Sequence, residues 1–368
     1  MGLLGLSGCG SPSSASVEMS SQTELVKTGS MELQYAENFA VDYYEDGYKM
    51  LTTLPDSKRY LLVPEGQPVP QGLDEDVSIL QEPLQNIYLV ASGVMDMFAS
   101  LDAVGQIRFS GQKQENWYIQ TAKDAMAAGD MIYAGKYSKP DYELLVSEGC
   151  DLAIENRMIT HSPEVVEMLQ SFDIPVMIEY SSYEQHPLGK VEWVKFFGAL
   201  TGKEAKAEEA FAEQTEILEE VESGEKTGKT IAFFYVTSNG LIQVRQSTDY
   251  IPKLIELAGG RYIFENLEDS GSGRSTLNMQ VEDFYAGAKD ADILIYNSSI
   301  DGGVTTVDEL IGKCNILKDF KAVQEGQVYC TTNDMYQQSM AVGYLLQDMH
   351  TVLTDDDTAK LRYLFLLQ

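Results

Sequence analysis

Arginine and tyrosine residues that follow short apolar segments are the side chains of this sequence best suited to bind a ligand. Arg157 and Met158 follow the apolar residues 151–154, at a position where α/β sheets bind ligands, beyond the carboxyl end of a strand. A guanidinium group matches paired carboxylate or catecholate oxygens, and a tyrosine offers a flat face with a hydroxyl group. With 21 tyrosines in the chain, a packing role remains the alternative for each of them. The predicted ligand-binding residues are Arg157, Met158, Tyr180, Tyr183, His186, Arg245, Tyr296 and Tyr336.

The sequence predicts neither a bare metal site nor a catalytic site. Its only histidines are His161, His186 and His350, whereas zinc sites need three or four converging ligands. His161 and His186 could converge, but a third histidine is missing, so neither is interpreted as a metal ligand. No GxSxG, P-loop or GxGxxG motif occurs. We therefore predict no enzyme activity and no cofactor.

Cys9 lies in a sequence typical of a lipidation signal. The residues Leu6, Ser7 and Gly8 precede it, and a serine-rich segment at residues 10–21 suits a flexible tether. The signal has no basic region and only a short apolar run, so it is either trimmed or an accidental match. Read as a lipobox, it predicts an exported protein whose only membrane contact is the lipid on Cys9. The other cysteines (Cys150, Cys314 and Cys330) have no metal-ligand spacing, and one disulfide among them is possible.

The overall charge of the chain excludes some classes of partner. A net charge of −31 over 368 residues argues against nucleic acid, because phosphate binding needs clustered Lys and Arg. It argues equally against a protein that lies flat on anionic lipid. No later window holds the roughly 18 apolar residues that a spanning helix needs. The length suggests two domains, and we expect a monomer.

Two segments resemble one another and must position the candidate residues. Residues 148–156 and 289–297 each contain an aspartate, then a short apolar strand and an asparagine-containing loop. A helical segment precedes each of them, and a second helix and strand follow. Short buried strands that alternate with helices predict parallel sheets covered on both faces. We therefore predict an α/β protein with two Rossmann-like lobes and a ligand cleft between them, although two ordinary βαβ units could also match by chance.

A long helix is predicted between these two halves. Pro187 starts an apolar helix that runs to about residue 200, and Thr201 and Glu204 have the spacing of a capping box for the next one. Apolar residues then recur at intervals of three and four as far as Ser223, which gives a rod of roughly 30 Å. A single helical connection permits only small lobe movements. The predicted organisation is a truncated signal, lipobox and tether (1–30), an N-terminal lobe (31–200), a linking helix (201–224) and a C-terminal lobe (225–368).

Taken together, residues 85–350 resemble the substrate-binding proteins of ABC importers, in the class whose lobes are joined by a long helix. The resemblance is best in residues 150–211, where segments such as 151–154, 162–169, 174–178, 180–184 and 186–189 follow the family's order. This class serves ferric siderophores, haem and cobalamin, and one branch binds bare zinc or manganese. The resemblance implies a lipid-anchored, extracytoplasmic protein on the cell membrane that delivers a metal chelate to an importer permease.

The resemblance also implies a docking glutamate in each lobe. Glu164 and Glu282 lie near the places where the family pairs one glutamate per lobe with permease arginines, and Glu167 is an alternative in the first lobe. The alternatives to chelate delivery are a bare manganese or zinc binder of the same architecture, an exported two-lobe α/β enzyme, and a surface adhesion or signalling domain. The sequence does not name the ligand, nor whether it carries iron, cobalt or no metal.

Overall fold

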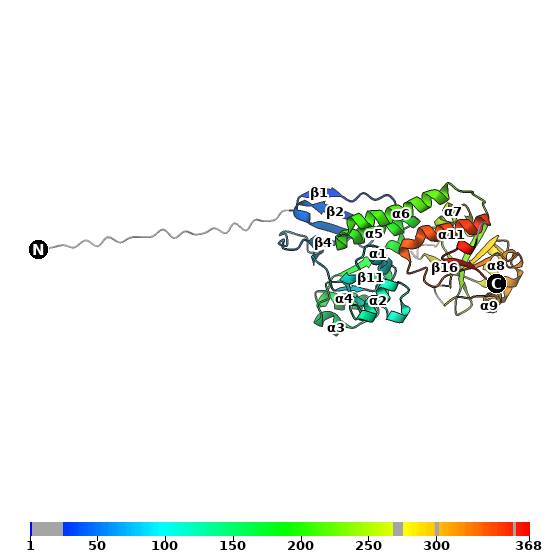
Figure 1. Cartoon of the computed structure of the whole chain (residues 1–368). Coiled ribbons are helices and arrows are strands. Elements are labelled where there is room, and N and C mark those ends of the chain that lie inside the picture. The colour runs from blue at the N-terminus through cyan, green and yellow to red at the C-terminus, as the bar shows by residue number, and fades with distance from the viewer. Residues whose placement is uncertain (2–24, 268–274, 299–301, 356–357) are drawn as a thin grey trace.

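The chain folds into two α/β lobes with a further sheet at the N-terminal side of the first lobe (Figure 1). The computed structural model describes residues 1, 25–267, 275–298, 302–355 and 358–368. The predicted α/β class with two lobes is therefore confirmed, whereas Cys9 lies outside the described residues. Within the described ranges, no helix combines the length and the apolar character that crossing a membrane requires.

The first lobe is built on a parallel sheet. Helix α1 (Val94–Ser100) packs on one face, with α2 (Gln120–Ala128) beside it, while α3 (Tyr142–Ser147) and α4 (Pro163–Ser171) cover the other. A short hairpin of β9 (Gly135–Lys136) and β10 (Lys139–Pro140) precedes α3. The strands follow the order β12 (Val176–Glu179), β11 (Leu152–Asn156), β6 (Ile87–Leu89), β7 (Ile107–Ser110) and β8 (Ile132–Tyr133).

The second lobe is built on a mixed sheet that is also covered on both faces. Helices α7 (Tyr250–Leu257) and α11 (Val342–Thr354) pack on one face, and α8 (Val281–Ala288), α9 (Val307–Lys313) and α10 (Lys321–Gln324) lie against the other. Strand β15 (Arg261–Tyr262) pairs with β13 beside the main path of the sheet. That path is β16 (Thr276–Met279), β14 (Ile242–Arg245), β13 (Thr230–Val236), β17 (Ile293–Tyr296), β18 (Val328–Thr331) and β19 (Leu364–Leu366).

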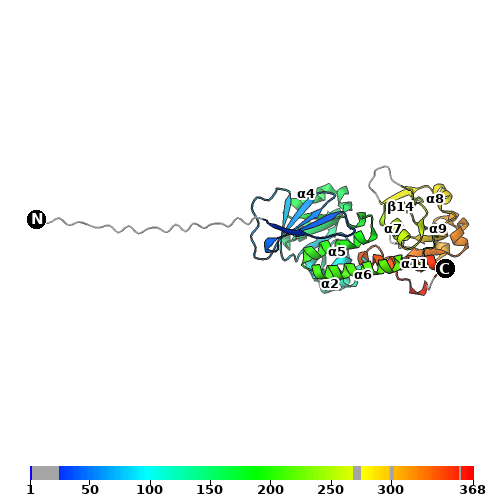
Figure 2. The same cartoon turned by 90° about the horizontal axis from the view of Figure 1, so that it is seen from above.

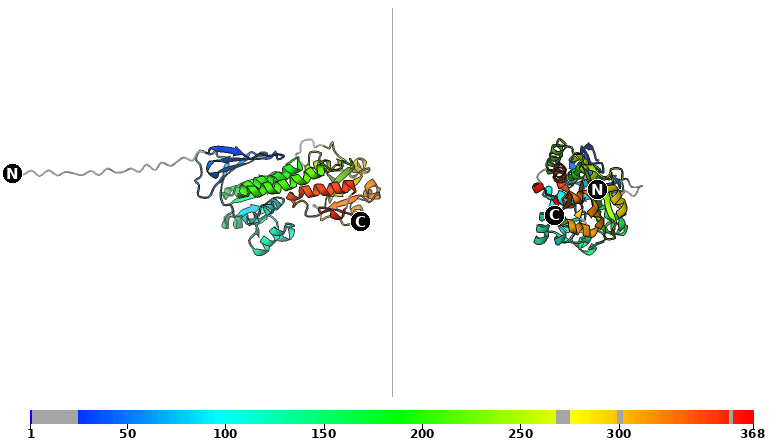
Figure 3. Two further views of the ribbon diagram at one scale, coloured as in Figure 1. Left: turned by 45° about the horizontal axis from the view of Figure 1, so that its top comes forward. Right: turned by 90° about the vertical axis from the view of Figure 1, so that its right-hand side faces the viewer.

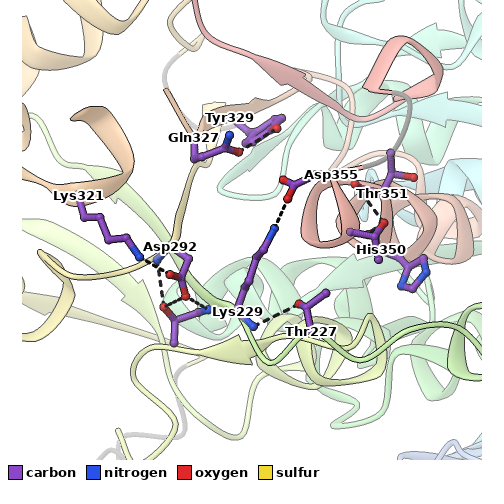
Figure 4. A network of polar contacts seen from close by, with 11 residues as sticks. Thr227, Lys229, Asp292, Lys321, Gln327, Tyr329, His350, Thr351 and Asp355 are labelled. Atoms are coloured by element: carbon purple, nitrogen blue, oxygen red, sulfur yellow. Dashed lines mark hydrogen bonds and ion pairs between the residues drawn. The ribbon is translucent and has the colours of Figure 1, made fainter. Parts of the chain in front are cut away.

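The two similar segments, residues 148–156 and 289–297, occupy corresponding places in the two lobes. Asp151 and Asp292 in them have the same structural role. Asp151 precedes β11 and accepts hydrogen bonds from the backbone N–H groups of Gln85 (2.9 Å) and Asn86 (2.8 Å), just before β6. Asp292 precedes β17 and accepts from the backbone N–H of Thr230 (2.7 Å) at the start of β13, and also from Lys321 (2.6 Å; Figure 4). Each aspartate thus joins the amino ends of two neighbouring parallel strands.

Figure 4 also shows Lys229 paired with Asp355 across 2.5 Å. Lys229 lies just before β13, and Asp355 ends α11, so this ion pair holds the helix against the sheet. Hydrogen bonds from Lys321 and Thr230 outweigh the effect of burial on Asp292 and lower its pKa to about 2. These polar contacts gather at the amino ends of the central strands, away from the edge where the strands end.

Two consecutive helices lie across both lobes. Helix α5 (Pro187–Thr201) is buried along its whole length, and α6 (Glu204–Glu222) packs against α5 and against α11 of the second lobe (Figures 1 and 3). The predicted capping box is wrong. Thr201 is the last residue of α5 and donates to the carbonyl oxygen of Phe197 (2.7 Å), because Gly202, at a φ of 68°, ends that helix first.

Residues before the first lobe form a sheet of their own, whose blue strands face the viewer in the left-hand part of the molecule in Figure 2. Short apolar runs such as residues 60–63 and 87–91 are strand-like in sequence, and they lie in or at β4 and β6; the first five strands, however, do not join the parallel sheet. Phe39 packs edge-on against Trp193 and Phe196 of α5, with ring centroids 5.0 and 5.3 Å apart. The strands are β1 (Lys27–Ser30), β2 (Phe39–Tyr44), β3 (Lys49–Thr53), β4 (Lys58–Val63) and β5 (Val77–Gln81), paired in this order.

Two buried glutamates attach this N-terminal sheet to α5. The carboxylate of Glu192 accepts hydrogen bonds of 2.8–3.2 Å from the backbone N–H groups of residues 34–36. Glu184, just before α5, accepts from the N–H groups of Glu37 (2.9 Å) and Asn38 (3.0 Å) and from the indole of Trp193 (2.8 Å). The attachment therefore satisfies five consecutive backbone donors, which would be costly to bury without partners.

Candidate functional site

A cavity of about 290 Å³ lies where loops from the two lobes meet. It lies beyond the carboxyl ends of β6, β11 and β12 in the first lobe, and the loop after β18 in the second lobe contributes Met335 and Tyr336. This is the edge at which parallel α/β sheets bind ligands. The lining residues are Ala91, Ser92, Gly93, Asn156, Arg157, Met158, Glu179, Ser182, Tyr183, Lys190, Arg245, Tyr250, Ser275, Met335 and Tyr336.

Arg157 stands directly after β11 because the chain turns there into a 3-10 helix, Arg157–His161. The side chain of Asn156 accepts the backbone N–H of Met158 (2.8 Å) and fixes that turn. The Arg157 guanidinium carbon lies 4.7 Å from the centroid of the Tyr183 ring. Met158, Tyr183 and Tyr336 are all exposed although they are large and apolar. Such surfaces beside a cationic group fit a ligand with flat or apolar parts and anionic oxygens.

Arg245 enters the cavity from the end of β14 in the second lobe. Its Nη1 lies 3.4 Å from Oδ2 of Asp249, and the guanidinium carbon lies 5.7 Å from the ring centroid of Phe233. Burial disfavours the charge on Arg245, but Asp249 and two nearby tyrosines outweigh it and raise the pKa of the arginine. Asp249 also accepts the backbone N–H of Ile251 (2.9 Å) at the start of α7. Arg245 is thus held in place by a buried carboxylate.

Two charged residues of the cavity, Glu179 and Lys190, were not predicted from the sequence. Glu179 ends β12 and accepts from the backbone N–H (2.8 Å) and the hydroxyl (2.6 Å) of Ser181, and burial raises its pKa. Lys190 lies in the first turn of α5, with its ammonium 4.7 Å from the ring centroid of Tyr250. The available signal was a lysine inside a mostly apolar helical segment, where a charged side chain needs a reason to be buried.

Five of the eight predicted ligand-binding residues line this cavity, and three do not. Tyr180 is buried beside it, with its ring centroid 6.4 Å from that of Tyr183. Tyr296 is fully buried against Phe234, because alternate residues of β17 point into the layer formed with α8 and α9. The five that line the cavity are Arg157, Met158, Tyr183, Arg245 and Tyr336.

His186 belongs to a different cavity, of about 300 Å³, which also reaches both lobes. Its ring stacks on Tyr35 with centroids 4.4 Å apart, and its Nδ1 accepts the backbone N–H of Leu188 (3.2 Å) at the start of α5. His186 therefore caps a helix and supports the N-terminal sheet. His161 is exposed after β11, and the Nδ1 of His350 lies 2.9 Å from the carbonyl oxygen of Ala258. Among the described residues, no group of three His, Cys, Asp or Glu side chains could hold a metal ion.

The remaining predicted residues fall on separate surfaces. Glu164 and Glu282 are both exposed, in the first turns of α4 and α8, so each lobe presents one of them. Among the residues that the structure describes, Cys150, Cys314 and Cys330 form no disulfide with one another. Burial raises the pKa of the Cys150 thiol to about 12, which makes it unreactive at neutral pH.

Comparisons with known proteins agree with this architecture. An uncharacterized lipoprotein of Methanocaldococcus jannaschii is 24% identical over 351 residues, which span 87% of this chain and 81% of that protein. The periplasmic haem-binding protein HutB of Vibrio cholerae has a TM-score of 0.57 at 15% identity, covering 73% of this chain and 98% of that one.

The periplasmic catecholate-siderophore binding protein VctP of Vibrio cholerae gives the same TM-score, 0.57, at 12% identity. The superposed residues cover 75% of this chain and 95% of VctP. These two likenesses concern the fold, which in both proteins carries a binding site for a small molecule. The family model described as "Periplasmic binding protein" matches residues 92–335, which hold most strands of the two lobes and nearly all of the cavity lining. The chain therefore belongs to the periplasmic binding protein family.

Proposed function

We propose that this protein is a lipid-anchored, extracytoplasmic binding protein that delivers a metal chelate to an ABC importer. The observation that carries the proposal is the charge of the cavity. Arg157, Lys190 and Arg245 line it together, whereas Glu179 is the one acidic side chain among the lining residues described. The chain has a net charge of −31, so three cationic side chains around one small cavity make a locally positive region on an acidic protein.

This charge pattern suits a chelate better than an uncomplexed cation. A bare divalent ion would be repelled by cationic side chains in a partly dry cleft. The carboxylate, hydroxamate or catecholate oxygens of a chelate would accept charge-assisted hydrogen bonds from the same side chains. Tyr183, Tyr250 and Tyr336 add flat surfaces for the organic part of the ligand. Relatives of the same fold named for haem and for a catecholate siderophore support this ligand class.

The size of the cavity adds a condition on binding. At about 290 Å³ it lies at the lower end of ordinary ligand pockets. A whole ferric siderophore, haem or cobalamin is larger, so part of it would extend beyond the cavity or the lobes would separate slightly. We propose that α6 is the single helical connection about which such a movement takes place.

We further propose that the protein acts as a monomer without enzyme activity. Glu164 and Glu282 are the residues that we propose dock on the permease.

Fluorescence titration of the protein against ferric siderophores, haem and cobalamin tests the ligand class. Arg157→Ala should weaken binding of the chelate by roughly ten- to a hundredfold, about 1.5–3 kcal/mol. Arg59→Ala is the matched control, because Arg59 pairs with Asp74 and Asp76 in the N-terminal sheet. If the wild type binds bare zinc or manganese tightly and no chelate, the proposed ligand class is wrong.

A further inference from the structure

We infer that Lys190 is a specificity residue of the cleft, which binds an anionic group of the chelate and so selects anionic chelates over neutral ones. The inference rests on the proposed function, since it concerns the ligand of the same cavity. The role inferred for Lys190 differs from that of Arg157, which lies in the loop directly after β11. Lys190 lies on a helix that is buried from end to end.

The first observation is the burial of the Lys190 side chain beside the cavity. Lys190 is only 6% exposed, yet it is one of the residues that line the cavity. Its ammonium lies over the ring of Tyr250, the first residue of α7 in the second lobe. A lysine is almost never buried to this extent without a partner for its charge. The ring face supplies part of that stabilisation, but it accepts no ordinary hydrogen bond.

The second observation is that no carboxylate pairs with Lys190. Asp96, Glu179 and Asp249 lie close enough to act on its charge. Across the described ranges of the chain, however, Lys190 makes no side-chain hydrogen bond and no ion pair. The three donors of its ammonium group are therefore available to whatever enters the cavity.

The acids around Lys190 are already engaged elsewhere. Oδ2 of Asp96 accepts the backbone N–H of Met340 at 2.7 Å. Glu179 accepts both donors of Ser181, and Asp249 is shared between Arg245 and the start of α7. These engagements hold the three acids in place near Lys190, and none of them forms an ion pair with its ammonium group. The arrangement preforms a cationic donor at little cost in side-chain freedom, because the lysine is already immobilised.

The chemical consequence is selectivity between ligands of different charge. An anionic oxygen placed on Lys190 would gain a charge-assisted hydrogen bond in a partly buried position. A neutral chelate of similar size would instead displace water from the ammonium and leave it unpaired, which costs free energy. Because the discrimination comes from an unpaired donor, it should disappear when the ammonium is replaced by a neutral group of similar length.

Two ferric probes of opposite character test the inference, a trianionic tris-catecholate and a neutral tris-hydroxamate. The wild type should prefer the tris-catecholate. Lys190→Met should lose roughly ten- to a hundredfold in affinity for it while its affinity for the tris-hydroxamate stays within about threefold. Lys190→Arg should retain most of the preference. Lys190→Gln serves the same purpose as Lys190→Met should the latter fail to fold, as judged by thermal denaturation.

The outcomes separate this inference from the proposed function. Equal losses for both probes would show that Lys190 only supports the structure, and unchanged affinities would show that it does not touch the ligand. Either result, or a wild-type preference for the neutral probe, overturns the inference and leaves the chelate-binding function standing. If the wild-type protein binds neither probe, both the inference about Lys190 and the proposed function are wrong for ferric chelates.

Discussion

The side-chain amide of Gln337 donates a hydrogen bond to the backbone carbonyl oxygen of Asn116 across 2.8 Å, which joins the second lobe to the first beside the cleft. The oxygen of the same amide accepts the backbone N–H of Tyr118, also at 2.8 Å, and Gln337 is fully buried. Met340, three residues further on, donates to Asp96 of α1. The lobes are therefore held together by this segment as well as by α6.

Replacing Gln337 should destabilise the protein markedly. Gln337→Ala would leave a carbonyl oxygen and an N–H group of the first lobe without their partner, at a cost of about 2–4 kcal/mol. Chemical denaturation measures this directly. Gln338→Ala is the control, because the Gln338 side chain makes a single long hydrogen bond of 3.5 Å to Asp334. A loss below about 0.5 kcal/mol for Gln337→Ala would contradict the idea that this contact holds the lobes together.

The movement of the lobes on ligand binding should be small. A helix such as α6 is a stiffer connection than a pair of extended strands, and the Gln337 contact adds a second constraint. We expect X-ray scattering curves of the free and the ligand-bound protein to differ only slightly. A large compaction on addition of the ligand would argue instead for a flexible hinge between the lobes.

The buried carboxyl group of Glu155 should make stability depend on pH. Neither of its oxygens has a hydrogen-bond partner among the described residues, and burial raises its pKa to about 8. Since the pKa is higher in the folded than in the unfolded state, the free energy of unfolding should fall as pH rises from about 4.5 to about 8.

Glu155→Gln should remove this dependence, with a gain above pH 8 on the order of 4–5 kcal/mol at most. Denaturation at pH 5, 7 and 8.5 would measure the difference. Glu167→Gln, at an exposed position on α4, should leave the free energy of unfolding unchanged. A constant difference between wild type and Glu155→Gln at all three pH values would show that this carboxyl group titrates normally.

Charge reversal at the two exposed glutamates should block transport without affecting ligand binding. Glu164→Arg and Glu282→Arg should each lower uptake by a reconstituted importer, because arginine would face arginine at the permease. Glu167→Arg tests the alternative in the first lobe. Glu143→Arg, on the neighbouring helix α3, is the control. Normal uptake by both single variants and by the double variant would remove these residues from the docking surface.

Cys9 should determine whether the protein stays on the membrane. If Cys9 carries the lipid, Cys9→Ala in the full-length precursor should release the protein from the membrane fraction. Fractionation and immunoblotting measure the distribution, and Cys150→Ala is the control because that thiol is free and lies inside the first lobe. Unchanged retention of the Cys9 variant would rule out the lipobox.

The parts of the fold that could be predicted are those with local signals. The aspartate and the apolar run at residues 148–156 and at 289–297 identified β11 and β17, because strand ends and their capping acids lie close together in sequence. The position of Arg157, as the first residue after a strand, could be predicted for the same reason. Gly202 shows where a local signal misled, since two overlapping helix-end patterns compete at residues 201–204 and the left-handed glycine decides between them.

Features that depend on distant partners could not be predicted. Tyr183 is exposed at the end of a 3-10 helix, whereas Tyr296 ends the buried strand β17. The layer of α8 and α9 that buries Tyr296 is fixed by tertiary packing. Lys190 becomes a cleft residue because Tyr250, 60 positions later, lies beneath its ammonium. Likewise, a strand-like apolar run such as residues 60–63 could not show that β1 to β5 pair among themselves.

The attachment of the N-terminal sheet to Glu184 and Glu192 imposes an order on folding. Residues 34–38 are synthesised early, yet the carboxylates that accept their N–H groups lie 146–158 positions later in the chain. Until those residues have been made, five backbone donors lack the carboxylates that accept from them in the folded protein. Contacts of such sequence separation form slowly, so attachment of the N-terminal sheet to α5 has to wait for nearly the whole of the first lobe. Residues 34–38, which precede both lobes in the chain, are thus among the last to reach their final structure.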